Sequence, residues 1–448
     1  MLQKRFNLFL NSKILPFEKI IEVDSDKSIS IRSLLIGAIS KNISSVKNIL
    51  ESEDVKSSIN CLKKLGVKIV KKGKKKYLIY GKGLGSFILK KNKILNFRNS
   101  GTLSRLLIGL LTTNPKIEIN VTGDKSLNKR SMKNLIELMK KFGANFYPKN
   151  KFFFPLKIIS SEMPIGINYK AGISAQLKSA VIFAGLNSYG ITQISEKQKS
   201  RDHTENMLLR NKQTIKVINN KNRLIQISGK KELNPIELNI PGDPSSAAFF
   251  TTLALLNKKS SLCIKNIGLN PTRIGFYNLL KKQGAKIQFN KLKKTNNELH
   301  GNIFVKTSKI KPLKASKKYY VNSTDEYPIL FVIAGLTKGV STFKGIGDLT
   351  NKESNRIREM QKILKQIGIR SQSKKDELKI FGKKLFDASE KNILVPNLGD
   401  HRICMSAFIL GVLTGAKTII KNFETVNTSS PSFLKLMKKL GAKFEIQK

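Results

Sequence analysis

The chain has 448 residues, of which 40% are apolar, so it is long enough for two or three domains and is not a disordered protein. Its formal net charge of +53 predicts anionic partners, which could be nucleic acid, a membrane surface or small phosphorylated substrates. No uninterrupted apolar run approaches the roughly 18 residues that a membrane-spanning helix needs. The lysine run from Lys71 to Lys76 lacks the interleaved aromatics of a base-stacking surface, so we interpret it as a solvated hairpin turn.

The three cysteines, Cys61, Cys263 and Cys404, are far apart in the sequence and lie in apolar surroundings. This spacing provides neither a disulfide framework nor a usual pattern of metal ligands. A reducing cytoplasm is therefore the expected location, and no metal site is expected.

The first strongly predicted helix begins at the polar residues Asp26 to Arg32 and continues into the apolar segment 33–39. Asp26 and Ser28 are both suitable N-cap residues. A helix that begins there directs its unpaired backbone N–H groups, together with Lys27 and Arg32, toward one point, which attracts phosphate or carboxylate. Taken alone, the stretch is more simply explained by a capped helix with two solvated cations.

The same pattern, a polar cluster that enters an apolar helix, recurs five times along the chain. The starts at residues 28, 99, 174, 243, 325 and 400 are separated by 71, 75, 69, 82 and 75 residues. Such nearly regular spacing indicates an internal repeat.

An amphipathic helix follows in each copy, and most of these helices end in cations and a glycine. Cations in the last turn and glycine just beyond it are typical of a helix C-terminus, where the glycine takes the left-handed conformation. The glycines are Gly66, Gly143, Gly284, Gly368 and Gly441, and in the third copy Asn211 is the expected left-handed residue. Each copy is therefore predicted to contain a buried helix, an exposed amphipathic helix and short strands.

Three copies precede residue 240 and three follow it, which predicts two similar globular halves. The first half is expected to comprise residues 23–239, and the second is expected to comprise residues 1–22 and 240–448. The polar helix starts of the two halves are expected to converge on a cleft.

The helix starts and the segments near them gather many cations and few carboxylates. Because arginine binds carboxylate and phosphate bidentately, this composition predicts a substrate with several negative charges, and the carboxylates are candidates for proton transfer. For each arginine alone a surface role is the simpler explanation, and for His401 alone a structural one. The residues concerned are Lys27, Ser28, Arg32, Arg105, Arg130, Ser174, Gln176, Asp325, Glu326, Lys352, Glu353, Arg356, His401 and Arg402.

Nine motifs in order along the chain resemble the 5-enolpyruvylshikimate-3-phosphate synthase family, and two of them are similar to its class II subgroup. These two are Ser174–Gln176 and Arg201–Glu205. The other seven are Asp26–Ser30 with Arg32, Asn99–Thr102 with Arg105, Gly123–Asp124 with Lys129–Arg130, Gly242–Asp243 with Ser245–Ser246, Asp325–Pro328, Lys352–Ser354 and Asp400–Arg402.

The resemblance implies an α+β fold of two similar domains, each of three βαβαββ units in an inverse α/β barrel-like arrangement, with the active site in the interdomain cleft. It implies transfer of the enolpyruvyl (1-carboxyvinyl) group of phosphoenolpyruvate to the 5-hydroxyl of shikimate 3-phosphate. Phosphate is the second product, and the route leads to chorismate and the aromatic amino acids. It also implies no metal or organic cofactor, no specific nucleic-acid or membrane partner, and a monomer.

Roles can be carried over to this sequence by position. In the resemblance, Asp325 would be the base toward the 5-hydroxyl, Glu353 would protonate the methylene carbon of phosphoenolpyruvate, and Lys27 would be the third catalytic residue. Shikimate 3-phosphate would be bound by Lys27, Ser28, Arg32, Ser174, Gln176, Arg201, Asp325 and Lys352. Phosphoenolpyruvate would be bound by Lys27, Gly101, Arg130, Gln176, Arg356 and Arg402.

The chain departs from the usual family pattern at a few positions. Asp24 and Ser25 stand where Pro-Gly is usual, and Ile31 stands where histidine is common. Further departures are Thr350 in place of arginine, Asn355 in place of aspartate, and Thr428 in a segment where some members have a lysine. These changes bear on affinity and supporting contacts more than on the identity of the reaction.

Two other functions stay open at this stage. The sister enolpyruvyl transferase that acts on UDP-N-acetylglucosamine carries a cysteine after its second buried helix, and segment 112–130 of this chain has none. An RNA-binding or RNA 3'-phosphate cyclase-like protein is suggested by the net charge of +53, and it would show steeply salt-dependent binding.

Overall fold

The structure is a computed structural model that describes residues 5–89, 94–219 and 222–447. Its contacts divide the chain into two compact units. Unit 1 comprises Met1–Asp24, Pro241–Thr295 and Leu299–Lys448, and unit 2 comprises Ser25–Ile240 together with Asn296–Glu298. Compared with the expected first half, unit 2 begins two residues later, ends one residue later and includes the short segment 296–298.

Unit 2 contains six helices and twelve strands within the described residues. The helices are α1 (Lys27–Ile39), α2 (Glu53–Lys64), α3 (Gly101–Leu111), α4 (Lys133–Lys140), α5 (Ala175–Leu186) and α6 (His203–Leu208). The strands are β3 (Ile43–Lys47), β4 (Lys68–Lys71), β5 (Tyr77–Tyr80), β6 (Ile94–Asn96), β7 (Glu118–Thr122), β8 (Asn145–Tyr147), β9 (Leu156–Ile159), β10 (Asn168–Ala171), β11 (Ile191–Glu196), β12 (Ile215–Asn219), β13 (Arg223–Ser228) and β14 (Glu237–Asn239).

Unit 1 contains seven helices and twelve strands within the described residues. The helices are α7 (Pro244–Leu256), α8 (Gly275–Lys282), α9 (Lys317–Ser323), α10 (Tyr327–Gly335), α11 (Arg356–Gln366), α12 (His401–Thr414) and α13 (Phe433–Lys439). The strands are β1 (Asn7–Leu10), β2 (Glu18–Ile21), β15 (Ser261–Gly268), β16 (Ile287–Thr295), β17 (Glu298–Lys306), β18 (Lys314–Ala315), β19 (Gly339–Lys344), β20 (Arg370–Lys374), β21 (Glu377–Gly382), β22 (Asn392–Val395), β23 (Lys417–Ile420) and β24 (Glu445–Gln447).

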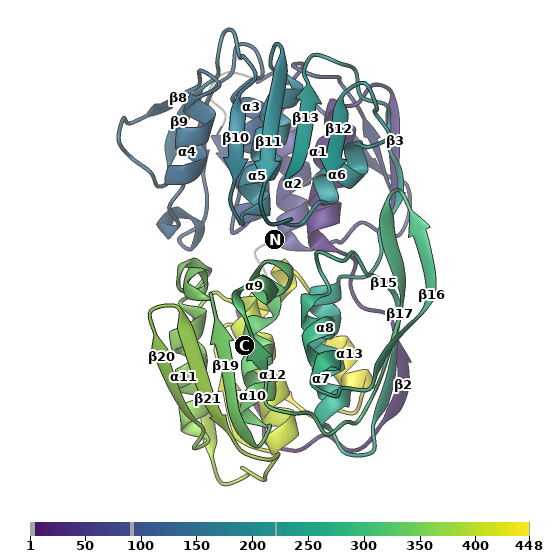
Figure 1. The fold of residues 1–448 in the computed structure, drawn as a ribbon, viewed down its shortest axis with the longest axis vertical. Coiled ribbons are helices and arrows are strands. Elements are labelled where there is room, and N and C mark those ends of the chain that lie inside the picture. Colours follow the sequence, from purple (N-terminus) through teal and green to yellow (C-terminus); the bar gives the residue numbers. More distant parts are fainter. Residues whose placement is uncertain (1–4, 90–93, 220–221, 448) are drawn as a thin grey trace. The chain divides into compact units, whose positions relative to one another are not determined.

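The three sheets of unit 2 share one topology. In the sheet of order β6-β7-β9-β8, the first two strands are parallel and the other neighbours are antiparallel, and the chain runs β6-α3-β7-α4-β8-β9. The sheet of order β10-β11-β13-β12 repeats both the pairing and the chain order. The sheet of order β14-β3-β5-β4 repeats the pairing, but its first strand, β14, comes from the end of the unit and not from before α1. The predicted βαβαββ repeat is therefore confirmed in this unit, and Figure 1 labels its α-helices and some of its strands.

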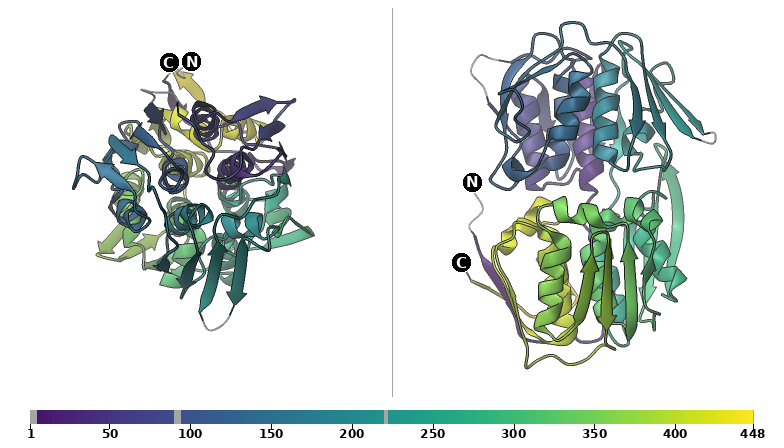
Figure 2. Two further views of the ribbon diagram at one scale, coloured as in Figure 1. Left: turned by 90° about the horizontal axis from the view of Figure 1, so that it is seen from above. Right: turned by 60° about the vertical axis from the view of Figure 1, so that its left-hand side comes forward.

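Two sheets of unit 1 each include one strand from the N-terminal segment of the chain. Strand β2 lies parallel to β15 at the edge of the sheet β16-β17-β15-β2. Strand β1 lies between β23 and β24, antiparallel to both, in the sheet β22-β23-β1-β24. The remaining sheet, β18-β19-β21-β20, is built from consecutive elements. Unit 1 thus also has three four-stranded sheets, and Figure 2 shows the helices and sheets of both units from two further directions.

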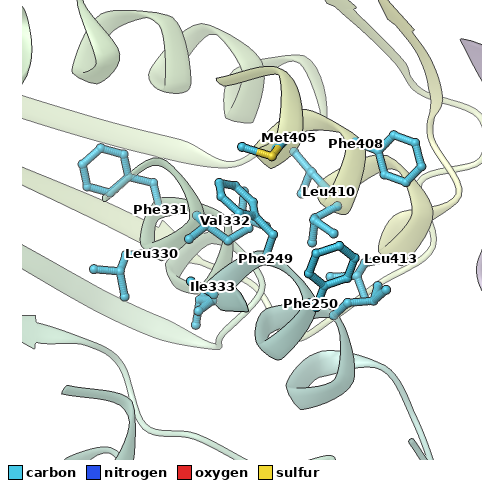
Figure 3. Packing of buried hydrophobic residues seen from close by; sticks show 14 of the residues in the cluster. Phe249, Phe250, Leu330, Phe331, Val332, Ile333, Met405, Phe408, Leu410 and Leu413 are labelled. Carbon is cyan, nitrogen blue, oxygen red and sulfur yellow. The ribbon is translucent and has the colours of Figure 1, made fainter. Parts of the chain in front are cut away.

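The apolar helices are buried, as their sequences predict. In unit 1, α7, α10 and α12 meet in one core whose members include Phe249, Phe331 and Phe408, all 0% exposed (Figure 3). In unit 2, α3 and α5 approach so closely that a Cβ added at Gly109 would lie 2.5 Å from the carbonyl oxygen of Ala180. Glycine is required there because any side chain would separate the two helices.

The helix caps explain where the buried helices begin. The side chain of Asp26 accepts a hydrogen bond from the backbone N–H of Ile29, so Asp26 caps α1, and Ser28 lies inside the helix. Side chains cap α3, α5, α7 and α12 in the same way, through Ser100, Ser174, Asp243 and Asp400. The start of α10 differs, because Glu326 at its N-cap makes no side-chain capping bond and a 3-10 turn, Thr324–Glu326, precedes it.

The predicted helix C-termini are confirmed at five positions and wrong at one. Gly66, Gly143, Gly284, Gly368 and Gly441 all have positive φ, between 76° and 97°. Asn211 is not among the residues with positive φ, and instead its side chain accepts a hydrogen bond from the backbone N–H of Asn234 at 2.8 Å. Its amide therefore ties the end of the third repeat to the segment that leads to β14.

The hairpin interpretation of the lysine run is confirmed, because β4 and β5 pair antiparallel on either side of it. All three cysteines are free, with Cys61 and Cys404 buried. Within the described residues, no helix is both long and apolar enough to cross a membrane. The described part of the chain also contains no cluster of three or more metal-ligating side chains.

Candidate functional site

The first two turns of α1 carry Lys27 and Arg32 in unit 2. The Lys27 Nζ atom lies 3.1 Å from Oδ2 of Asp54, which belongs to the first turn of α2 and is almost buried. Asp54 was not predicted as a site residue, although an acidic residue at the start of a helix is a recognisable signal. The ion pair fixes the Lys27 ammonium group, whose side chain is 16% exposed.

Arg32 is 3% exposed, and its guanidinium group is held by two other helices of unit 2, α5 and α6, and by the backbone of its own helix. Its Nε donates to Thr204 Oγ1 at 2.8 Å, and one Nη donates to Ser179 Oγ at 3.2 Å and the other to the carbonyl oxygen of Ser28 at 3.1 Å. Thr204 lies in the Arg201–Glu205 motif, and Arg201 itself is half-buried at the start of this segment. The structure thus links Arg32 to that motif through a residue 172 positions away.

Two arginines of unit 2 lie close to the N-terminus of α3. Arg105 donates to the carbonyl oxygen of Gly101 at 2.9 Å, and Arg130 donates to Ser126 Oγ at 3.2 Å and to the side chain of Asn99. A Cβ added at Gly101 would lie 2.8 Å from Arg105 and 3.1 Å from Arg130. The missing side chain at Gly101 therefore leaves room for both guanidinium groups beside the backbone of the helix N-terminus.

The start of α5 contributes two further predicted residues. Ser174 uses its hydroxyl to cap the helix, accepting from the backbone N–H of Leu177 at 3.3 Å. Gln176 donates from its side-chain amide to Thr102 Oγ1 at 3.0 Å. Because Thr102 follows Gly101, this bond joins the starts of α3 and α5.

Arg356 is the centre of a second cluster, in unit 1. Its Nε donates to Asp400 Oδ2 at 2.9 Å, one Nη donates to Glu353 Oε2 at 2.6 Å, and the other lies 3.9 Å from Asp325 Oδ1. Asp400 also caps α12 and accepts a hydrogen bond from Ser354 Oγ at 3.0 Å. Burial alone would lower the pKa of Arg356, but Asp400 and Glu353 outweigh it and raise that pKa, so the guanidinium group stays charged.

The two predicted catalytic carboxylates differ from Asp400 in exposure. The side chains of Asp325 and Glu353 are 27% and 20% exposed, whereas that of Asp400 is fully buried. Asp325 lies in the 3-10 turn before α10, so the irregular start of this helix places a carboxylate beside Arg356 without using it as a cap. Two accessible carboxylates and one structural carboxylate thus surround a single arginine.

Lys352 lies apart from the Arg356 cluster and pairs with Asp348. Its Nζ donates to Asp348 Oδ2 at 2.5 Å, and the same oxygen accepts a hydrogen bond from the hydroxyl of Tyr320 at 2.7 Å. Burial and the neighbouring Asp348 raise the pKa of Tyr320, so its hydroxyl remains protonated. Neither partner was predicted, although Asp348 precedes Lys352 by four residues, a spacing typical of ion pairs.

Arg402, on α12, is 4% exposed, and its guanidinium carbon lies 5.9 Å from the centre of the Phe249 ring. Its Nε and one Nη have no hydrogen-bond partner among the described residues. A buried arginine with open donors is suited to bind an anion. His401 precedes it and is 5% exposed.

The departures from the family pattern have local explanations. Asp24 is buried and accepts hydrogen bonds from the backbone N–H of Ser432 at 2.8 Å and from its hydroxyl at 2.9 Å. Asn355 caps α11 by accepting from the backbone N–H of Arg358, and Ile31 is 0% exposed in the core of unit 2. The hydroxyl of Thr350 donates to the carbonyl oxygen of Gly347. The hydroxyl of Thr428 donates to the carbonyl oxygen of Thr425.

Comparisons with known proteins show the family of this chain. The chain matches the sequence profile described as EPSP synthase (3-phosphoshikimate 1-carboxyvinyltransferase) over residues 12–437. It is 38% identical to a 3-phosphoshikimate 1-carboxyvinyltransferase from Petrotoga mobilis, covering 96% of this chain and 99% of that protein. The corresponding enzyme from Zymomonas mobilis is 36% identical, with 98% and 97% covered.

A solved structure of EPSP synthase from Acinetobacter baumannii is also similar to this chain. It superimposes with a TM-score of 0.84 at 31% identity, covering 99% of this chain and all of that one. The profile, the curated relatives and the solved structure all match the chain over nearly its whole length. The chain belongs to the EPSP synthase (3-phosphoshikimate 1-carboxyvinyltransferase) family.

Proposed function

We propose that this protein transfers the enolpyruvyl group of phosphoenolpyruvate to the 5-hydroxyl of shikimate 3-phosphate, giving 5-enolpyruvylshikimate 3-phosphate and phosphate. Membership of the EPSP synthase family, whose profile matches residues 12–437, supports this reaction. The observation that carries the proposal is the placement of Asp325 and Glu353 on two sides of the Arg356 guanidinium group. Proton removal and proton donation both need a carboxyl group, and the arginine supplies charge for an anionic substrate.

The cations of the two units have complementary tasks in this proposal. Phosphoenolpyruvate carries a carboxylate and a phosphate, and we assign these groups to Lys27, Arg130, Arg356 and Arg402, with Gly101 and Gln176 beside them. Shikimate 3-phosphate also carries a carboxylate and a phosphate, and we assign it to Lys27, Ser28, Arg32, Ser174, Gln176, Arg201, Asp325 and Lys352.

The carboxyl groups act in sequence. A protonated Glu353 gives its proton to the methylene carbon of phosphoenolpyruvate, which leaves the central carbon electrophilic. The 5-hydroxyl oxygen attacks that carbon while Asp325 takes the hydroxyl proton, and a tetrahedral ketal forms. The bond between the central carbon and the phosphate oxygen then breaks, and the methyl group returns a proton to Glu353. The leaving phosphate accepts the proton held by Asp325.

Glu353 must be protonated for the first step. Its contact with Arg356 provides a way for substrate binding to control this protonation. Without substrate, the bond from Arg356 favours the ionised carboxylate. When Arg356 binds the carboxylate of phosphoenolpyruvate, Glu353 loses its cation and gains a neighbouring anion. We therefore propose that binding of phosphoenolpyruvate to Arg356 itself loads the catalytic proton on Glu353.

The direct test is to mix the purified protein with shikimate 3-phosphate and phosphoenolpyruvate and to measure phosphate release. Release that depends on both compounds is expected, with none when UDP-N-acetylglucosamine replaces shikimate 3-phosphate. The opposite acceptor preference would overturn the assignment. We also propose that the protein is a monomer and does not bind nucleic acid specifically. The free cysteines support the proposal that it is located in the cytoplasm. Nanomolar affinity for RNA near physiological salt would contradict the proposed absence of specific nucleic-acid binding.

A further inference from the structure

Four charged side chains form a closed ring in the interior of unit 2, which we name the buried ring: Lys178, Glu196, Glu205 and Arg223. Lys178 Nζ lies 2.9 Å from Glu196 Oε1 and 2.7 Å from Glu205 Oε1. Arg223 closes the ring, with one Nη 2.5 Å from Glu196 Oε2 and 3.0 Å from Glu205 Oε1. The first three side chains are 0% exposed, and Arg223 is 10% exposed.

The buried ring is electrically balanced, with two cations alternating with two anions on α5, β11, α6 and β13. Burial alone would raise the pKa of Glu196, but Lys178 and Ser200 outweigh it and lower that pKa. Burial alone would lower the pKa of Arg223, but Glu205 and Glu196 raise it. Glu196 and Arg223 therefore hold their charges, and a buried ion pair is by itself weak evidence for a role in stability.

The buried ring contacts both ends of the segment 200–205. At the first end, Glu196 Oε1 accepts hydrogen bonds from the hydroxyl of Ser200 at 2.7 Å and from its backbone N–H at 3.2 Å. Lys178 also donates to the carbonyl oxygen of Ser200 at 3.4 Å. At the other end, Glu205 is itself a member of the ring. The segment is thus fixed at both ends by the same four charges.

The residues between these ends include two that we assign to shikimate 3-phosphate recognition, directly or through a partner. Arg201 directly follows Ser200. Thr204 directly precedes Glu205, and its hydroxyl accepts the Nε hydrogen bond of Arg32. Thr204 also shares a hydrogen bond of 2.8 Å with Ser179, the neighbour of Lys178 on α5. A shift of the segment would therefore move both Arg201 and Arg32.

We propose that the buried ring is a positioning device for shikimate 3-phosphate: it fixes the segment 200–205 so that Arg201 and Arg32 meet the two anionic groups of that substrate. None of its four residues touches substrate in this role. The inference rests on the proposed function, because it assigns the two arginines to shikimate 3-phosphate. It predicts a defect specific for one substrate, since phosphoenolpyruvate is assigned to other arginines.

The test is the double variant Lys178→Met with Glu205→Gln. It removes one cation and one anion together, and the remaining pair of Glu196 and Arg223 stays neutral, so no buried charge is left alone. We expect the KM for shikimate 3-phosphate to rise by about 10- to 100-fold, because small displacements of positioning groups have effects of that order. The KM for phosphoenolpyruvate should stay within about twofold of the wild-type value.

Two further variants complete the experiment. Ser200→Ala removes only the hydroxyl contact with Glu196 and is expected to raise the same KM by several-fold. Glu51→Gln is the matched control, because Glu51 pairs with Lys71 at 2.6 Å and accepts from the Tyr77 hydroxyl at 2.9 Å, in another sheet. It should leave both KM values unchanged.

The proposal is overturned if the folded double variant keeps the wild-type KM for shikimate 3-phosphate, or if both KM values rise equally. Should the double variant not fold, wild-type behaviour of Ser200→Ala overturns it instead. Calorimetric binding of shikimate 3-phosphate provides the same comparison without turnover. A wild-type protein that binds this compound but releases no phosphate would contradict the proposed function and not the role of the buried ring.

Discussion

Glu353 accepts a hydrogen bond of 2.6 Å from the guanidinium group of Arg356, so the proposed proton donor is paired with a cation that favours its ionised form. In the proposed reaction, this pairing makes proton loading of Glu353 depend on what Arg356 binds next. A fixed donor would instead be protonated before substrate arrives. The relationship between these two side chains thus connects substrate binding with the chemistry that follows.

The variants Glu353→Gln and Asp325→Asn should fold normally and lose turnover. Each replaces a carboxyl group by an amide of similar size, so the contacts with Arg356 change little in shape while the proton-transfer group disappears. We expect kcat to fall by about 10²- to 10⁴-fold, the usual contribution of general acid–base catalysis. Phosphate release at saturating substrate measures the effect.

The control for this pair is Asp387→Asn, which removes an exposed carboxylate that pairs with Lys13 and lies outside the Arg356 cluster. Its kcat should equal that of the wild type. If Glu353→Gln or Asp325→Asn kept the wild-type rate with an unchanged melting temperature, the corresponding catalytic role would be wrong.

Asp400→Asn should separate the capping role of this residue from its charge. Asparagine can still cap α12, but it no longer supplies the buried anion that orients Arg356. We expect the free energy of unfolding to fall by about 3 kcal/mol relative to wild type. We also expect the KM for phosphoenolpyruvate to rise by a larger factor than the KM for shikimate 3-phosphate. Chemical denaturation and steady-state kinetics measure the two effects, and equal changes in both KM values would contradict the orientation of Arg356 by Asp400.

Gly101→Ala should weaken phosphoenolpyruvate binding without unfolding unit 2. The new methyl group would lie 2.8 Å from Arg105 and 3.1 Å from Arg130, and both contacts are with the flexible ends of side chains that can move away. Because Arg130 then leaves its place, we expect the KM for phosphoenolpyruvate to rise by about tenfold. Gly172→Ala, where an added methyl group meets nothing within 4 Å, is the control and should behave like wild type.

The contribution of Glu196 to stability should depend on pH. Its pKa in the folded protein is lowered, because Lys178 and Ser200 outweigh the opposing effect of burial. A carboxyl group with a lowered folded-state pKa stabilises the fold above its ordinary pKa of about 4.3, and this contribution is lost as the pH falls through the folded-state value.

We therefore expect Glu196→Gln to lower the free energy of unfolding by about 3–5 kcal/mol at pH 7, and by progressively less below pH ~4. Urea unfolding at several pH values measures this difference. The exposed Glu232, which pairs with Lys41, provides a control whose Gln variant should stay within about 0.5 kcal/mol of wild type. A difference for Glu196→Gln that grows in acid would reverse the assigned sign.

The cysteines should differ in reactivity toward a thiol reagent. Burial raises the pKa of Cys61 to about 12 and also raises that of Cys404, whereas Cys263 is half-buried. Since the thiolate is the reactive form, we expect Cys263 to react first in the native protein at pH 8, and the other two to react only after unfolding in guanidinium chloride. Rapid modification of all three in the native state would contradict the buried positions of Cys61 and Cys404.

The features that could be predicted from the sequence are those with a local cause. The cap at Asp26, the left-handed Gly66 and the apolar helices depend on neighbouring residues, so their patterns are visible in a single copy and clearer when they recur. Asn211 was the exception, because a contact with Asn234 holds its side chain and the left-handed conformation is not used.

The contacts within the site could not be predicted, since they join distant parts of the chain. Arg32 reaches Thr204, and Arg356 reaches Asp400, across 172 and 44 residues. The sequence did not predict the buried ring for the same reason. Lys178 and Arg223 lie on different elements, and in the sequence neither can be distinguished from an ordinary surface cation. Their burial follows only from the packing of α5 against its sheet.

The N-terminal strands have a consequence for the order in which this protein can fold during synthesis. Nearly all of unit 2 is one continuous segment, from Ser25 to Ile240, so its sheets have almost all their strands once that segment has left the ribosome. Strand β1 is made before all of them, yet Leu8 pairs with Ile420 and Ile446. The earliest strand of the chain therefore lacks both of its native partner strands until the last residues have been made.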